Sequence, residues 1–216
     1  MTLSLFETIQ RIVQQELGRV RTAELAIVQE QHPHAGDSDK DNYACTVALR
    51  DSGIVLKQVP VATQRIGAVS IPAVGELVLV QFIGGDINAP VITGRLYNDE
   101  ERPPVNDDNQ AIVHLPLAAE DSDAVHLELH SGDTRQVLIK LGDGISVTIQ
   151  DDDPVLIVEV DSGKVTVQID RDGAVNVESQ GDLSVKGNNV NIEAQGDLNL
   201  KAGGNANIQG ATVNLN

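Results

Sequence analysis

Histidines and clustered acids are the side chains of this protein best suited to catalysis or metal binding. His126 and His130 fall on one face of a predicted strand, with Glu128 between them. A neutral imidazole can bind zinc. A His-x3-His spacing along a strand matches no particular ligand geometry, however, so we interpret these side chains as part of a solvated face.

Three other polar positions have simple structural interpretations. The run Asp151-Asp152-Asp153 has the composition of a cation site, but oxygen-ligand sites need several segments, so we interpret it as an acidic turn. His32 and His34 lie in a polar loop. Cys45 is the one cysteine, which excludes an intrachain disulfide and favours a small buried apolar side chain. We expect no catalytic residue, no metal site and no cofactor, and therefore no enzyme.

The charge of the chain is strongly acidic and unevenly distributed. The 216 residues have a formal charge of −17, and residues 99–216 hold 22 of the 32 acidic side chains. Nucleic-acid binding needs cations that displace counterions from phosphates, so this composition argues against it. No run approaches the ~20 apolar residues of a membrane span. The aromatic residues Phe6, Tyr43, Phe82 and Tyr97 all lie in the first 97 residues, which places a globular core there.

Residues 1–21 are predicted to contain an amphipathic helix over residues 3–17. Ser4 and Glu7 have the spacing of a capping box at its start. The helix either packs on its own domain or docks on a partner through its apolar stripe. The residues of that stripe are Phe6, Ile9, Val13 and Leu17.

Residues 22–98 are predicted to form a small closed barrel of the size of an OB-fold. Alternating apolar residues bounded by turn residues indicate five short strands, and closure would remove their exposed edges. The predicted strands are Ala23–Glu30, Tyr43–Arg50, Ile54–Val61, Glu76–Ile83 and Ala89–Tyr97. Residues 99–124 are a charged linker or neck with a short strand near Ile112–Leu115.

Residues 125–216 alternate between apolar and polar almost continuously and predict a rigid oligomeric β-shaft. The segment Gln180–Leu183 returns as Gln195–Leu198, a period of 15 residues, which is typical of a solenoid or prism. Strands this short need partners to bury their apolar sides. The apolar residues expected in the shaft core are Val175, Val177, Leu183, Val185, Val190, Ile192, Leu198 and Leu200.

The stretch from Gly67 to Asn98 carries a specific family resemblance. It resembles the OB-fold of phage baseplate assembly protein V and of VgrG-type spike proteins over a long pattern with fixed spacing. The residues that carry the resemblance are Pro72, Val74, Gly75, Glu76, Phe82, Gly84, Gly85, Asp86, Pro90, Gly94, Leu96, Tyr97 and Asn98.

The resemblance implies an all-β homotrimer, in which a collar of OB-folds is followed by a trimeric β-helix or β-prism spike. Such a spike lies at the centre of the baseplate of a contractile tail or injection machine and punctures the target envelope. It implies assembly in the bacterial cytoplasm and a place in a virion or in an extracellular or secreted particle. Because only about 20 residues precede the barrel, the hub is expected to be a separate protein on which the N-terminal helix docks.

The resemblance also implies a partner at the tip. Some short phage spikes end in a His-x-His iron site, whereas the last histidine here is His130. A blunt trimeric end needs a cap, and in the family this role falls to a PAAR-repeat protein. The expected contact residues are Ala206, Ile208, Ala211, Val213, Leu215 and Asn216.

Two other classes of function stay open. A trimeric fibre or adhesin would use the same kind of shaft. A β-helical carbohydrate-active enzyme would also be built from short strands. The residues do not identify the type of machine, the target cell or any cargo.

Overall fold

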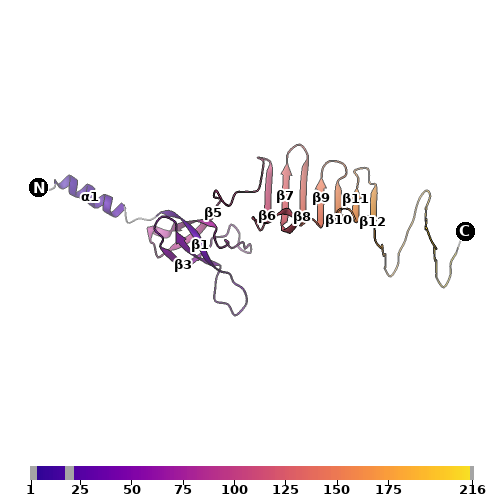
Figure 1. The fold of residues 1–216 in the computed structure, drawn as a ribbon, viewed down its shortest axis with the longest axis horizontal. Helices are drawn as coiled ribbons and strands as arrows, with labels where there is room; N and C mark the ends of the chain where they lie inside the picture. The colour runs from indigo at the N-terminus through magenta and orange to yellow at the C-terminus, as the bar shows by residue number, and fades with distance from the viewer. Residues whose placement is uncertain (1–3, 18–21, 215–216) are drawn as a thin grey trace.

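The computed structural model describes residues 4–17 and 22–214, without the side chains of residues 15–17. A helix, a small barrel, a row of antiparallel strands and an extended C-terminal segment follow one another along the longest axis (Figure 1). The expectation of an almost all-β chain with a short N-terminal helix is confirmed. No helix in the described residues has the length and apolar character needed to span a membrane.

Helix α1 (Leu5–Leu17) starts at the predicted capping box. The Ser4 backbone N–H donates to Glu7 Oε2 at 2.8 Å, and the Glu7 N–H donates to Ser4 Oγ at 3.2 Å. Two backbone donors at the helix start are thereby satisfied. All side chains described in this helix are exposed, including Phe6, so the helix does not pack on the barrel. The side chain of Leu17 lies outside the described residues.

The first sheet is the predicted closed barrel. Its five strands pair antiparallel in the order β3-β2-β1-β4-β5. A parallel bridge between Val61 and Ile92, with the Ala62 N–H donating to Ile92 O at 2.8 Å, joins the end of β3 to β5 and closes the barrel. The strands are β1 (Ala23–His32), β2 (Ala44–Leu49), β3 (Val55–Pro60), β4 (Leu77–Phe82) and β5 (Pro90–Leu96).

The hydrophobic core of the protein lies inside this barrel. Alternate residues of the strands fill it with aliphatic side chains and Phe82. Cys45 is fully buried there, which confirms its structural role, and this burial raises the pKa of its thiol. The core residues are Ala26, Val28, Cys45, Val47, Leu49, Val59, Val78, Val80, Phe82 and Ile92.

The second sheet is a meander of seven strands in chain order, each antiparallel to the next. Its first strand extends the short strand predicted in the neck. The 3₁₀ turns η1 (Ile83–Gly85) and η2 (Asp121–Asp123) precede β5 and β7. The strands are β6 (Gln110–Leu115), β7 (Val125–Ser131), β8 (Arg135–Leu141), β9 (Ile145–Gln150), β10 (Leu156–Val160), β11 (Val165–Ile169) and β12 (Val175–Ser179).

Gly142 holds the β8–β9 turn against η2. Its φ is +57°, its N–H donates to Ala124 O at 2.9 Å, and a Cβ at this position would lie 2.3 Å from the backbone oxygen of Ser122. A side chain here therefore strains the backbone and also forces the turn away from η2.

We expect Gly142→Ala to lower the melting temperature of the protein clearly more than Gly173→Ala does. Gly173 has a φ of +92°, but a Cβ there would meet no atom within 4 Å, so this matched variant carries only the backbone strain. That strain is about 1–3 kcal/mol. Thermal unfolding followed by circular dichroism tests this, and equal melting temperatures for the two variants would contradict it.

The segment from Gln180 to Asn214 contains no strand, in contrast to the strands that its alternation predicts. Its apolar pairs span only three residues between turn residues, and isolated hairpins of this length are not stable in one chain. Leu183 and Leu200 are 70% and 78% exposed. This segment therefore has the apolar–polar alternation of β-strands, but within one chain no neighbouring strand pairs with it.

Candidate functional site

One complete face of the second sheet is aliphatic. The register pairs Ala111 with Leu129, Leu129 with Val137, and Val137 with Ile149, so alternate residues of successive strands fall on the same side. Apart from Ser131, Arg135 and Ser179 at its margin, this apolar face consists of Ala111, Val113, Leu115, Val125, Leu127, Leu129, Val137, Ile139, Leu141, Ile145, Val147, Ile149, Leu156, Val158, Val160, Val165, Val167, Ile169, Val175 and Val177.

The apolar face is open to solvent in the single chain. Val125, Ile149 and Val175 are 48%, 49% and 63% exposed. Figure 1 shows the sheet as a single layer. A contiguous aliphatic surface of this extent marks a protein–protein interface, since each Å² left in water forgoes about 25 cal/mol. The expected core residues Val175 and Val177 belong to this face, and their burial stays a prediction.

The opposite face of the same sheet is mostly polar. His126, Glu128 and His130 lie on it together, as the spacing predicts, and Lys140 is the register partner of His126 on β8. His126 and Glu128 are only 17% and 19% exposed, which corrects the interpretation of a solvated face. They contact each other, with His126 Nε2 3.5 Å from Glu128 Oε2, so each shields the other from water.

The acidic run after β9 is a turn, as interpreted from the sequence. Asp151 accepts hydrogen bonds from Arg135 Nε at 2.5 Å and from the Arg135 N–H at 2.7 Å, and these bonds lower the pKa of its carboxyl group. Asp153 Oδ1 accepts from the Arg171 N–H at 2.8 Å, and the Arg171 side chain donates to Asp151 O. The carboxylates of Asp151 and Asp153 therefore accept hydrogen bonds from groups of the protein itself. In the described part of the chain, no group of three or more His, Cys, Asp or Glu residues is arranged to hold a metal ion.

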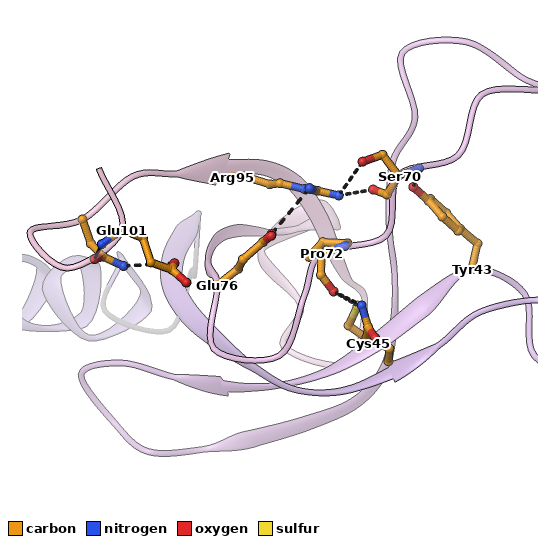
Figure 2. Close-up of polar contacts among 9 residues, drawn as sticks. Tyr43, Cys45, Ser70, Pro72, Glu76, Arg95 and Glu101 are labelled. Atoms are coloured by element: carbon orange, nitrogen blue, oxygen red, sulfur yellow. Dashed lines mark hydrogen bonds and ion pairs between the residues drawn. The ribbon is translucent and has the colours of Figure 1, made fainter. Parts of the chain in front are cut away.

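Glu76 of the family pattern takes part in a set of polar contacts on one side of the barrel (Figure 2). Arg95 on β5 lies with its guanidinium 3.5 Å from Glu76 Oε2 and donates to the Ser70 backbone and hydroxyl oxygens. The Ser70 N–H in turn donates to Tyr43 Oη at 2.7 Å. These contacts attach the loop before β4 to β5 and β2. Pro72 in that loop is fully buried.

The remaining residues of the family pattern shape turns. Gly75, Gly84 and Gly85 have positive φ, which glycine adopts without strain. Asp86 Oδ1 accepts from the Asn88 N–H at 2.9 Å, and Asn98 Oδ1 accepts from the Glu101 N–H at 2.7 Å. The pattern therefore specifies a barrel. Gly94 lies half-buried within β5, opposite Leu79, and the other members lie at strand ends or at the surface, namely Val74, Pro90, Leu96 and Tyr97.

The expected contact residues at the two ends of the chain are exposed where they are described. Phe6, Ile9 and Val13 form an exposed stripe on α1. Ala206, Ile208, Ala211 and Val213 are exposed in the segment without strands, whereas Leu215 and Asn216 lie outside the described residues. The expected shaft-core residues begin at Val175 and so do not include the apolar residues of β6 to β11. The alternation of Val137, Ile139 and Leu141 is an example of the signal that identifies them.

The barrel and its turn pattern define the class of this domain. Residues 13–97 match the family described as the type VI secretion system/phage-baseplate injector OB domain. Over this region the resemblance to baseplate assembly protein V and to VgrG-type spike proteins is confirmed.

Individual relatives come from the same class. The type VI secretion system spike protein VgrG1c of Pseudomonas aeruginosa is 47% identical over 68 residues, which are 32% of this chain and 8% of that protein. VgrG1a of the same organism is 32% identical over 68 residues and 9% of its own length. The matched segment thus spans less than a tenth of these spike proteins.

Proposed function

We propose that this protein is the central spike of a contractile injection machine, either a phage tail baseplate or a related injection or secretion system. Its role is structural and membrane-puncturing rather than enzymatic. It is assembled in the bacterial cytoplasm as a homotrimer and then forms part of a virion or of an extracellular or secreted particle. The observation that carries the proposal is an injector OB domain followed by a sheet with one face that is aliphatic except at its margin.

Three copies of the sheet can bury this face completely. Arranged around a threefold axis with their apolar sides inward, they form a closed prism with an aliphatic interior and the polar faces outside. The segment of residues 180–214 continues the same alternation, so that strands from three chains supply one another with the partners that a single chain lacks. A closed section of this kind resists bending, because neighbouring strands share the load.

The acidic charge suits the same arrangement. The apolar face holds no acidic side chain, so the acids of residues 99–216 lie in the linker, in the turns and on the polar face, outside the interior of the prism. Like charges on neighbouring particles repel one another and keep the spike soluble. The envelope is therefore contacted only when contraction drives the spike forward.

Each end of the chain offers one proposed contact. At the start, α1 presents Phe6, Ile9 and Val13 at helical spacing to a hub or tube protein, since an apolar stripe on an exposed helix suits a hydrophobic groove. Near the other end, the exposed apolar pairs around Ile208 and Val213 are the proposed contact with a tip protein in the trimer. A PAAR-repeat tip protein would cover the strand edges exposed there.

The native mass of the purified protein tests the proposal. One chain has a mass of 23.0 kDa, so light scattering at moderate salt should give about 69 kDa for the trimer. A mass of about 46 kDa would indicate two sheets packed face to face, and a stable monomer would indicate a sheet covered within one chain. Either result would overturn the spike, whereas a trimer that retains hub and PAAR proteins on purification would support its place in the machine.

A further inference from the structure

The pairing of β6 with β7 brings two histidines together on the polar face of the sheet. His114 and His126 are register partners, and their Nδ1 atoms lie 3.2 Å apart. The rings meet edge-on, with an angle of 71° between their planes. Their separation in sequence hides this pair, because spacing alone points to His126 and His130.

The other nitrogen of each ring already faces an oxygen. His114 Nε2 lies 3.0 Å from the backbone oxygen of Ala119, and His126 Nε2 lies 3.5 Å from Glu128 Oε2. Both oxygens can only accept a hydrogen bond, so the tautomer with a proton on each Nε2 satisfies both contacts. In neutral imidazoles of this tautomer both Nδ1 atoms are unprotonated, and they lie 3.2 Å apart.

Two unprotonated nitrogens at this distance repel each other unless they share a cation, which is either a proton on one ring or a metal ion bound by both. A tetrahedral zinc ion binds imidazole nitrogens at about 2.0–2.1 Å, which places two such nitrogens about 3.3 Å apart. The observed separation is 3.2 Å. Metal-bound histidines also commonly donate their second N–H to a carboxylate or to a backbone carbonyl, and both kinds of acceptor are present here.

We propose that His114 and His126 form a binding site for a divalent transition-metal ion on the polar face of β6 and β7. The two Nδ1 atoms are the protein ligands, and water completes the coordination. Glu128 is a positioning residue, held by a hydrogen bond of 2.7 Å from Gln110 Nε2 to its Oε1. The ion is of the zinc or nickel type, because imidazole favours these over magnesium. The site lies within one chain and does not depend on the proposed function.

The site is tested by calorimetric titration of the full-length, tag-free protein with zinc chloride at neutral pH. Millimolar magnesium in the buffer occupies the acidic surface, so that the heat reports the histidine site. One zinc ion per chain is expected. His114→Gln and His126→Gln are each expected to weaken binding at least about tenfold, since each removes one ligand. Glu128→Gln keeps both ligands and is expected to weaken binding about tenfold through lost positioning.

His130→Gln is the matched control. His130 lies on the same strand and face, but its Nδ1 contacts Thr134 O at 3.1 Å and not another ring, so zinc binding should be unchanged. Thermal unfolding of each variant shows whether it is folded. Nitrogen-15 NMR of the wild type supplies a second readout, in which zinc should shift the Nδ1 signals of two histidines. Absence of zinc binding by the wild type, or equal losses in all histidine variants, would overturn the proposal.

Discussion

Replacing Val137 with aspartate is expected to abolish the trimer and leave a monomeric protein with an intact barrel. Val137 lies within the apolar face, between Leu129 on β7 and Ile149 on β9. In the closed prism its carboxylate would be buried without a partner in each of the three subunits. An unpaired buried charge costs at least about 3 kcal/mol, and the threefold axis triplicates that cost. Light scattering should therefore report the mass of one chain.

Gln136→Asp is the matched control for this prediction. Gln136 is the preceding residue on β8 and lies on the polar face, where it donates to Gln150 Oε1 at 3.1 Å. The same acidic group there stays in contact with water, so the trimer should persist. The two variants carry the same new side chain and differ in the face that bears it. A trimer that survives Val137→Asp, or dissociates equally in both variants, would contradict the inward orientation of the apolar face.

The barrel could be predicted from the sequence because its signals are local. In each strand apolar and polar residues alternate, and turn residues bound the strand at both ends. Between β4 and β5 the turn residues are Gly84, Gly85 and Asp86. Closure also follows from physical reasoning, since five short strands in an open sheet would leave exposed edges. The bridge between Val61 and Ile92 supplies this closure in the structure.

Features that depend on register could not be predicted in the same way. Alternation shows that Val137 and Ile139 share a face, but not which residue of the next strand lies beside them. The contact between His114 and His126 depends on this register, and so does the extent of the apolar face. The shielding of Glu128 by His126 likewise becomes visible only when the side chains are placed.

The C-terminal repeats show a different limit. Their alternation is as regular as that of β6 to β12, yet residues 180–214 form no strand within one chain. Each pair is too short to hold a hairpin, so the information in the sequence concerns an assembly and not a monomer. The sheet and the repeats therefore differ in what they need. The sheet supplies its own hydrogen-bonding partners and lacks only a cover, whereas the repeats lack both.

Ile192→Asp is accordingly expected to prevent the repeats from ordering while the upstream sheets remain associated. Ile192 is 70% exposed in the single chain and becomes an interior residue in the proposed shaft. In the trimer, three aspartate carboxylates would be buried at the same height around the threefold axis. The strands near residue 192 should therefore not form. Hydrogen exchange measured by mass spectrometry should show protection of residues 180–214 in the wild-type trimer and loss of that protection in the variant. The melting temperature of the trimer should fall as well.

Asn191→Asp supplies the comparison, because Asn191 alternates with Val190 and Ile192 and faces outward in the shaft. Its carboxylate stays hydrated, so protection of the repeats should match the wild type. Fast exchange of residues 180–214 in the wild-type trimer itself would mean that the repeats stay unpaired, and the shaft would then end at β12. Retained protection in Ile192→Asp would instead place Ile192 on the outer surface, with the repeats wound in the opposite orientation. Exchange in the wild type therefore shows whether the shaft forms, and the two variants show which residues fill its interior.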